Sequence, residues 1–200
     1  MTHKDAYSIL FVCTGNVCRS PAAEAILRHK AGEQGFSSAL FLDSAGTTAQ
    51  HLEEAPTNLS VLEGGRRGYD LAMLRGRQIC QKDFDTFDKI VCMTRDHIRE
   101  LKTKFAPAVL SGKAELVLFS DLSPAKLPID LVDPWGMDQT VYAQMYDLLE
   151  LGLTDFALDL KNQLGQKINL DKNRPYEAKN STNEGQNRGY KRLFAAYKGL

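Results

Sequence analysis

The sequence predicts an α/β protein whose core is a four-stranded parallel sheet with helices on both faces. Three observations lead to this prediction. Short apolar segments typical of buried strands alternate along the first 164 residues with longer segments typical of helices. Strands that are joined by helices run parallel, and the helices cover both faces of the sheet. A length of 200 residues, 43% of them hydrophobic, suits one such domain followed by an extension.

The first strand, loop and helix are the most clearly marked elements. Residues 8–13 form a short apolar segment rich in strand-forming residues, which indicates a buried strand. Gly15 and Asn16 follow, the two residues of this loop that most easily adopt a positive φ. Pro21 is typical of the first helical position, and we expect the helix to end at Gly32. The chain therefore opens as strand, tight loop and helix.

The same alternation continues along the chain. Further strands are predicted at residues 39–44, 89–93 and 115–119. Helices are predicted at residues 58–63, 94–104 and 139–164. We expect Gly64 and Gly65 to stop the first of these helices and Thr94 to cap the second. Ligands of such sheets bind beyond the carboxyl ends of the strands, where the loop after the first strand lies.

Residues 165–200 depart from this pattern and form a second region beside the domain at residues 1–164. They are polar and rich in Asn and Gly, and they carry a net charge of +5, against −5 for the first 164 residues. We expect a flexible basic tail. A short amphipathic helix is the one element expected there, from the spacing of Tyr190, Leu193, Phe194 and Tyr197. A disordered basic end is the simpler interpretation, and contact with an anionic membrane or an acidic partner is the alternative.

Composition excludes several classes of function. The chain has 25 basic and 25 acidic residues, so it offers no overall positive charge for binding nucleic acid. No segment has the length of a signal-peptide core or of a membrane span, and we therefore expect a cytoplasmic protein with reduced cysteines. The four histidines are scattered away from any cysteine pair, which predicts no metal site, and no cofactor is expected.

The loop at residues 13–20 has the features of an anion-binding site with a reactive cysteine. It lies between a predicted strand and a predicted helix, where unpaired backbone N–H groups and the helix dipole favour an anion. Arg19 offers a planar fork that can hold two oxygens of a phosphoryl group. Cys13 lies beside Arg19 and within reach of the Ser20 hydroxyl, an environment that favours the thiolate. The loop therefore predicts a nucleophilic cysteine that attacks a bound oxyanion.

This loop resembles the signature of a known family. Residues 12–27, VCTGNVCRSPAAEAIL, are similar to the signature of the low-molecular-weight protein tyrosine phosphatases. The similarity extends to residues 44–47, to DFDTFDKIVCM at residues 83–93 and to the Asp-Pro pair at residue 133, and covers roughly residues 7–163. It implies the fold of that family and hydrolysis of phosphotyrosine in proteins through a cysteinyl-phosphate intermediate.

The resemblance also implies roles for individual residues. Cys13 would be the nucleophile, Arg19 the phosphate clamp and Asp133 the general acid. Asn16 and Ser20 would shape the loop and stabilise the thiolate. The remaining residues expected to bind the substrate or its phosphate are Thr14, Gly15, Val17, Cys18 and Trp135.

The chemistry supports Asp133 independently. A poor leaving group such as an aryloxide needs a proton, which a carboxylic acid on a mobile loop can deliver. Asp133 lies in a long proline-rich segment that is typical of an active-site loop. A plain Asp-Pro turn is the structural alternative, and Asp130 is the nearby competitor for the acid role.

Cysteine and arginine residues outside the nucleophile each allow more than one interpretation. Cys18 could capture an oxidised Cys13 as a reversible disulfide, or it could be a packed thiol. Cys80 and Cys92 are expected to be structural. Arg75 and Arg77 resemble a basic patch of the family, and a solvated face is the simpler interpretation.

The substrate is less constrained than the chemistry. Trp135 could stack on a phosphotyrosine ring, although many tyrosine-specific members have two aromatic residues there and Gly136 follows here. Members that act on phosphoarginine resemble CTGNTCRS, with a hydroxyl where this chain has Val17. An arsenate reductase with the same loop, or a phosphoprotein-binding module without catalysis, would also fit the motif.

Overall fold

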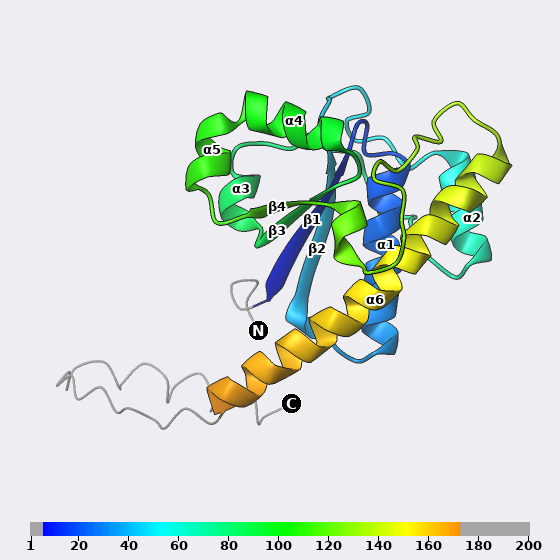
Figure 1. Ribbon diagram of the computed structural model, residues 1–200. Coiled ribbons are helices and arrows are strands. Elements are labelled where there is room, and N and C mark those ends of the chain that lie inside the picture. Colours follow the sequence, from blue (N-terminus) through cyan, green and yellow to red (C-terminus); the bar gives the residue numbers. More distant parts are fainter. Residues whose placement is uncertain (1–5, 173–200) are drawn as a thin grey trace, which may run out of the picture. The chain divides into compact units, whose positions relative to one another are not determined.

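The computed structural model describes residues 6–172 and contains the predicted four-stranded parallel sheet (Figure 1). Its strands are β1 (Tyr7–Cys13), β2 (Leu40–Gly46), β3 (Lys89–Cys92) and β4 (Glu115–Leu118). Their order in the sheet is β2-β1-β3-β4, and every neighbouring pair is parallel. The predicted bounds of the strands differ from the observed ones by one or two residues. The predicted fold class is confirmed.

The helices of the described residues fall into two groups that cover the two faces of the sheet (Figure 1). One face is covered by α1 (Arg19–Glu33) and α6 (Gln139–Lys172), with α2 (Asn58–Arg66) beside them. The other is covered by α3 (Asp83–Thr86), α4 (Arg95–Lys104) and α5 (Ala106–Ser111). Two short 3₁₀ segments, η1 (Ser37–Ala39) and η2 (Phe119–Leu122), complete the described elements.

The central strand β1 supplies side chains to two separate hydrophobic cores. Ile9, Phe11 and Cys13 belong to the core beneath α1 and α6, whereas Leu10 and Val12 belong to the core beneath α3, α4 and α5. Successive side chains of a strand point to opposite faces, so a strand buried on both faces is apolar throughout. Cys13, the last residue of β1, is thus held on the α1 face by the register of its own strand.

The start of α1 differs from the prediction. The helix begins at Arg19 rather than at Pro21, because the N–H of Ala22 donates to the carbonyl of Cys18 at 3.2 Å and closes a turn before the proline. Pro21 is tolerated at the third position because the N–H groups of the first turn have no partner within the helix. The loop that follows β1 is therefore shorter than predicted, and Arg19 and Ser20 lie in the first helical turn.

The predicted end of α1 at Gly32 is also wrong. The helix passes through Gly32 and ends at Glu33. Gly35 has a φ of 76°, and the N–H of Phe36 donates to the carbonyl of Ala31 at 3.0 Å. This is the usual helix end in which a left-handed glycine follows the last turn.

The prediction that Gly64 and Gly65 end the second helix is wrong, since α2 continues to Arg66. Gly64 has a packing role instead. A Cβ at this position would lie 2.6 Å from Cδ1 of Leu71 and 2.7 Å from the hydroxyl of Tyr146. Glycine is needed here because another helix approaches closely.

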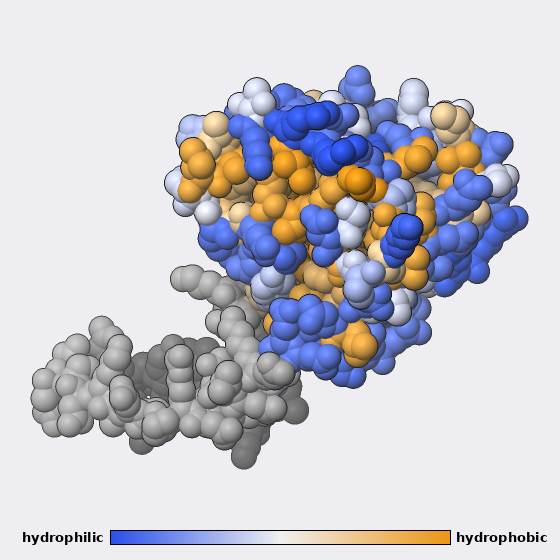
Figure 2. All heavy atoms as spheres, viewed as in Figure 1, coloured by the Kyte–Doolittle hydropathy of each residue, from blue (hydrophilic) through white to orange (hydrophobic). Residues whose placement is uncertain are grey.

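The last helix is longer than predicted, because α6 continues to Lys172 rather than ending at residue 164. The expected basic tail with its amphipathic end therefore starts within α6, and residues 173–200 lie outside the described part of the chain. Between residues 6 and 172, no helix is long and apolar enough to cross a membrane. Figure 2 shows hydrophilic residues along α4 and hydrophobic residues over the middle of the same face.

Candidate active site

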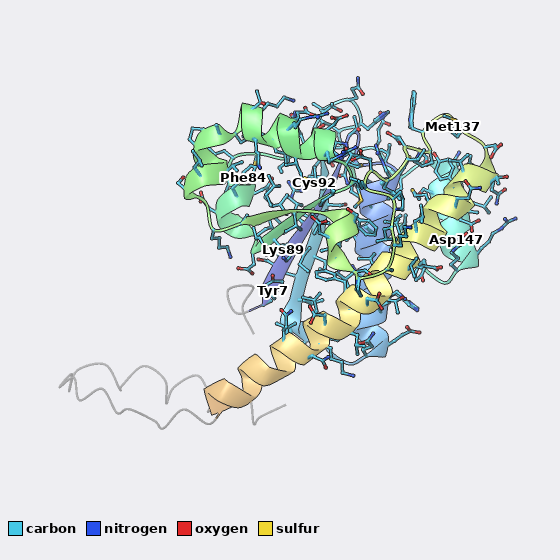
Figure 3. The ribbon with its side chains drawn as sticks, in the orientation of Figure 1. Tyr7, Phe84, Lys89, Cys92, Met137 and Asp147 are labelled. Carbon is cyan, nitrogen blue, oxygen red and sulfur yellow. The ribbon has the colours of Figure 1, made fainter. Side chains whose placement is uncertain are left out.

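The loop at residues 13–20, called here the phosphate-binding loop, lies at the point where the order of the strands in the sheet reverses. The chain moves from β1 to β2 on one side and later to β3 on the other side of β1. A crevice opens at the carboxyl ends of the strands at such a point. Figure 3 labels Tyr7 and Lys89, which begin β1 and β3, and Cys92, which ends β3.

The sulfur of Cys13 is surrounded by hydrogen-bond donors. Its Sγ is 3.0 Å from the hydroxyl of Ser20 and accepts the backbone N–H of Asn16 at 3.3 Å. Asn16 has a φ of 59°, as predicted, and this left-handed conformation turns its N–H toward the sulfur. Cys13 itself is only 2% exposed. The sulfur is thus both buried and hydrogen-bonded at the start of the loop.

A chain of hydrogen bonds orients the Ser20 hydroxyl. The side-chain oxygen of Asn16 accepts the backbone N–H of Arg77 at 2.9 Å, so the amide nitrogen faces Ser20 and donates to its hydroxyl at 2.9 Å. The single proton of Ser20 then remains for Cys13 Sγ or for the carbonyl of Ala45, which is 3.3 Å away. A thiolate at Cys13 would accept the hydrogen bond from this hydroxyl.

Arg77 is neither a basic patch nor a solvated residue. Its side chain donates to Asp43 at 2.9 Å and to Asp83 at 3.0 Å. This pairing fixes the backbone whose N–H holds Asn16. The Arg75 side chain, by contrast, is exposed and donates to the carbonyls of its own turn.

Two glycines let other backbone and side chains approach the loop. Gly15 does not adopt the predicted left-handed conformation; a Cβ there would lie 2.8 Å from Cδ2 of His51, so this glycine provides space. A Cβ on Gly46 would lie 2.6 Å from the carbonyl oxygen of Thr14. The end of β2 therefore lies directly against the backbone of the phosphate-binding loop.

Arg19 is buried beside the sulfur, with 3% exposure. Its Nη1 donates to the carbonyl of Leu131 at 3.1 Å, and its Nη2 donates to Thr14 Oγ1 at 3.2 Å and forms an ion pair with Asp133. Within the described residues, Nε of Arg19 is buried and has no hydrogen-bond partner. Burying an N–H without a partner is unfavourable, and the Arg19 side chain to which this N–H belongs lines the pocket.

Asp133 and Trp135 lie on residues 123–138, called here the acid loop. The Asp133 side chain is 44% exposed, and its second oxygen accepts the N–H of Trp135 at 3.2 Å. Asp130, the competitor for the acid role, instead pairs with Arg95 at 2.7 Å and does not line the pocket. Met137, labelled in Figure 3, marks the outer part of this loop before α6.

These residues line one pocket of about 110 Å³, several times the volume that one water molecule needs. Eight of the ten predicted site residues line it directly, and the other two, Asn16 and Ser20, contact the sulfur of Cys13. The lining residues are Cys13, Thr14, Gly15, Val17, Cys18, Arg19, Gln50, His51, Asp133 and Trp135.

Sequence reasoning missed Gln50 and His51 in the pocket and His97 beneath it. The ring of His51 lies 6.2 Å from that of Trp135 between centroids, and its Nδ1 is 2.8 Å from Glu54. Both rings form walls of the pocket. Gln50 and His51 lie in the irregular segment after β2, and His97 lies in the first turn of α4 after β3. Only their position after strand ends could have indicated them.

The other cysteines have different environments. Cys18 Sγ is 3.3 Å from the hydroxyl of Tyr142 and 3.6 Å from that of Thr57, and burial raises the pKa of its thiol. Burial in β3 also raises the pKa of Cys92, and Cys80 is exposed. The resolving role of Cys18 stays a prediction.

A cysteine in an anion-binding loop at the carboxyl edge of a parallel sheet, with a buried arginine and a carboxylic acid from a second loop, defines a cysteine-dependent phosphatase. The model of the low molecular weight phosphotyrosine protein phosphatase family matches residues 8–168. The chain belongs to this family.

Individual relatives agree with this assignment. The human low molecular weight phosphotyrosine protein phosphatase is 36% identical over 148 residues, which are 72% of this chain and 92% of that protein. The crystal structure of a low molecular weight phosphotyrosine phosphatase from Vibrio cholerae is similar with a TM-score of 0.71 and 28% identity, over 79% of this chain and 99% of that chain. YwlE arginine phosphatase, which is known from Bacillus subtilis, gives a TM-score of 0.67 and 26% identity, over 77% of this chain and 95% of that chain.

Proposed function

We propose that this chain hydrolyses phosphotyrosine in proteins, with Cys13 as the nucleophile. The observation that carries this proposal is the pair of donors on the sulfur, Asn16 N–H and Ser20 hydroxyl, at a pocket that also contains Arg19. These donors stabilise negative charge on sulfur, and the thiolate is the form that attacks phosphorus.

In the first step, the phosphoryl oxygens bind the loop N–H groups and the free Nε of Arg19. The ion pair between Arg19 and Asp133 opens as the phosphoryl group takes over Arg19. The sulfur of Cys13 then forms a bond to phosphorus while the bond from phosphorus to the tyrosine oxygen breaks. Protonated Asp133 gives its proton to that oxygen, so that tyrosine leaves as a neutral phenol.

In the second step, the same carboxylate acts as a base. Asp133 takes a proton from a water molecule whose oxygen attacks phosphorus, and the bond between phosphorus and Cys13 sulfur breaks. Inorganic phosphate leaves, the thiolate returns and Asp133 is protonated again. The Ser20 hydroxyl and the Asn16 N–H stabilise the sulfur as leaving group, because they hold its negative charge in both steps.

The pocket walls favour a phenyl ring over a guanidinium group. Trp135 and His51 provide two rings for stacking, and Val17 adds an apolar lining. Phosphoarginine is the second candidate substrate, because YwlE, similar in structure, is named an arginine phosphatase. Thr14 and the single aromatic residue of the acid loop agree with that candidate. Val17 supplies no hydroxyl to hold a guanidinium.

Two further candidates have less support. An arsenate reductase needs a relay of thiols, yet Cys92 belongs to the core on the sheet face opposite Cys13. A pure binding module needs neither a stabilised thiolate nor an acid.

The physiological setting, phosphorylated proteins in the cytoplasm, stays an expectation, as does contact between residues 165–200 and an anionic lipid or acidic partner. Flotation of the full chain and of a chain ending at residue 164 with anionic liposomes would test that contact, and equal behaviour of the two would exclude it.

Turnover of a phosphotyrosine peptide, an aryl phosphate, phosphoarginine and arsenate under the same conditions tests the proposed function. We expect the phosphotyrosine peptide to have the highest kcat/KM. Cys13→Ser should lower phosphate release by about 10⁴-fold or more while the protein still binds vanadate. If kcat/KM were higher for phosphoarginine than for the phosphotyrosine peptide, phosphoarginine would be the preferred substrate. Full activity of Cys13→Ser would exclude the mechanism.

A further inference from the structure

His97, from the helix that follows β3, contacts the phosphate-binding loop that follows β1. It lies in the first turn of α4, just beyond the carboxyl end of β3, and is 5% exposed. Its ring Nε2 is 3.0 Å from Oγ1 of Thr14, and its backbone N–H donates to the hydroxyl of Thr94 at 3.3 Å. The imidazole is therefore held by α4 and touches the loop that follows β1.

Thr14 is the partner of Arg19 that does not depend on the acid loop. Of the described partners of the guanidinium, the carbonyl of Leu131 and the carboxylate of Asp133 both belong to residues 123–138. The third is Thr14 Oγ1, 3.2 Å from Nη2. When the acid loop moves away or a phosphoryl group displaces the carboxylate, Thr14 remains to hold the fork.

The charge of His97 suits this position. Burial lowers the pKa of His97 to about 4, and the positive charge of Arg19 acts in the same direction. The acidic groups that face the ring and act in the opposite direction are Glu100, Asp133 and Asp130. At neutral pH the imidazole is thus uncharged and binds the Thr14 hydroxyl without placing a second cation beside Arg19.

We infer that His97 is a positioning residue that fixes the hydroxyl of Thr14 and, through it, the guanidinium of Arg19. The inference rests on the proposed function, in which Arg19 binds the phosphoryl group. In either tautomer of the ring the threonine oxygen can accept from Arg19, because one hydroxyl offers two lone pairs and one proton. The phosphate clamp is then held in place independently of the position of the acid loop.

Three variants separate this role from simple packing. His97→Gln places an amide near the position of Nε2 and keeps a neutral polar contact to Thr14. His97→Leu fills the space without a polar group. Thr14→Val removes the hydroxyl with little change of shape, and Thr14→Ser is its matched control, because it retains the hydroxyl.

Vanadate affinity and steady-state kinetics with an aryl phosphate are the two measurements. Trp135, the single tryptophan of the chain, lines the pocket, so its fluorescence reports vanadate binding without any turnover. We expect His97→Leu and Thr14→Val each to weaken vanadate binding and to lower kcat/KM by about tenfold, the effect of one hydrogen bond that holds a charged group. His97→Gln should lose less than His97→Leu, and Thr14→Ser less than Thr14→Val, because each retains a polar contact between positions 14 and 97.

The double variant decides whether His97 acts through Thr14. In the Thr14→Val background, His97→Leu should cause no further loss, since the contact is already absent. Independent, multiplying losses would overturn the inference, as would unchanged vanadate affinity in a folded His97→Leu protein. If His97→Leu does not fold, equal vanadate affinity of Thr14→Val and Thr14→Ser overturns it. A wild type that binds vanadate but turns over no phosphotyrosine would count against the proposed function alone.

Discussion

Two of the loops that line the pocket are built in opposite ways. In the phosphate-binding loop, Cys13, Asn16 and Arg19 are each at most 3% exposed, and their polar atoms are held by hydrogen bonds from several elements. The acid loop, in contrast, leaves large hydrophobic side chains in solvent. Trp135 is 59% exposed, and Ile129, Val132 and Met137 are each more than half exposed.

The difference agrees with what each loop must do in the proposed mechanism. The sulfur and the guanidinium must already be in place when the phosphoryl group arrives, because reorganising charged groups during the reaction would raise its barrier. In that mechanism Asp133 must leave Arg19 and reach the leaving group. Its loop is held at other points, by the buried Leu131, whose N–H donates to Met93 O at 3.0 Å, and by the Ser123 hydroxyl, which donates to Asp155 at 2.6 Å. Rigidity and freedom are thus divided between two connections of one sheet.

Removing the acid should give the largest effect and tests the freedom of the acid loop. We expect Asp133→Ala to lower kcat for a phosphotyrosine peptide by about 10²–10⁴-fold, and activated aryl phosphates far less, because their leaving groups need less protonation. Asp133→Asn, which can still contact Arg19 but gives no proton, should match the alanine variant. Equal losses for both substrates would assign the acid role elsewhere.

Distorting the rigid loop should give the next largest effect. Gly46→Ala places a methyl group 2.6 Å from the Thr14 carbonyl, and we expect a loss of about 1–3 kcal/mol in the free energy of unfolding. Displacement of the loop should lower kcat/KM by up to about 10²-fold. Gly32→Ala is the control, because its Cβ would meet nothing within 4 Å. A Gly46→Ala enzyme with full activity would show that the loop is less rigid than its contacts suggest.

Low pH should reduce the stability of the folded protein through protonation of His97. Its pKa is lowered to about 4 in the folded protein, below the unfolded value of 6.5, so its contribution to stability is present above pH 6.5 and is lost as pH falls toward 4. The free energy of unfolding of the wild type should therefore fall relative to His97→Gln by at most about 1.4 kcal/mol per pH unit in this window. Urea titrations at several pH values measure this. Parallel pH profiles would mean that folding does not lower the pKa of His97.

The smallest effect is expected from the exposed part of the acid loop. Asp130→Asn removes a solvent-exposed ion pair with Arg95 that lies outside the pocket. We expect kcat/KM to change by less than about twofold, since exposed pairs contribute little. A loss comparable with that of Asp133→Ala would make Asp130 part of the catalytic machinery.

Much of the molecule could be predicted from local patterns. The alternation of strand-like and helix-like segments was sufficient to predict the sheet, and residues 12–27 were sufficient to predict the loop and to indicate the family. Thr94 was correctly predicted as a helix cap, and its hydroxyl accepts the N–H of His97.

What local patterns could not give depends on contacts between distant segments. The local pattern predicts that Gly64 ends a helix, but its role is set by Tyr146, which is 82 positions away in the printed sequence. The same pattern predicts a backbone role for Gly15, whereas the neighbouring His51 explains it. His51, which lines the pocket, and His97, which contacts Thr14, follow other strands, and only the order of the strands brings them to the phosphate-binding loop.

The left-handed turn at Asn16 also limits how far the signature can be transplanted. Its shape is imposed by Arg77, Ser20 and the close approach of Gly46, none of which a free peptide of residues 12–19 would possess in the right place. A graft of these eight residues onto a foreign strand–helix junction should therefore fail to capture phosphate unless the end of β2 and residues 76–79 are transferred as well. The sequence signature identifies the family, but the binding site is a property of the whole sheet edge.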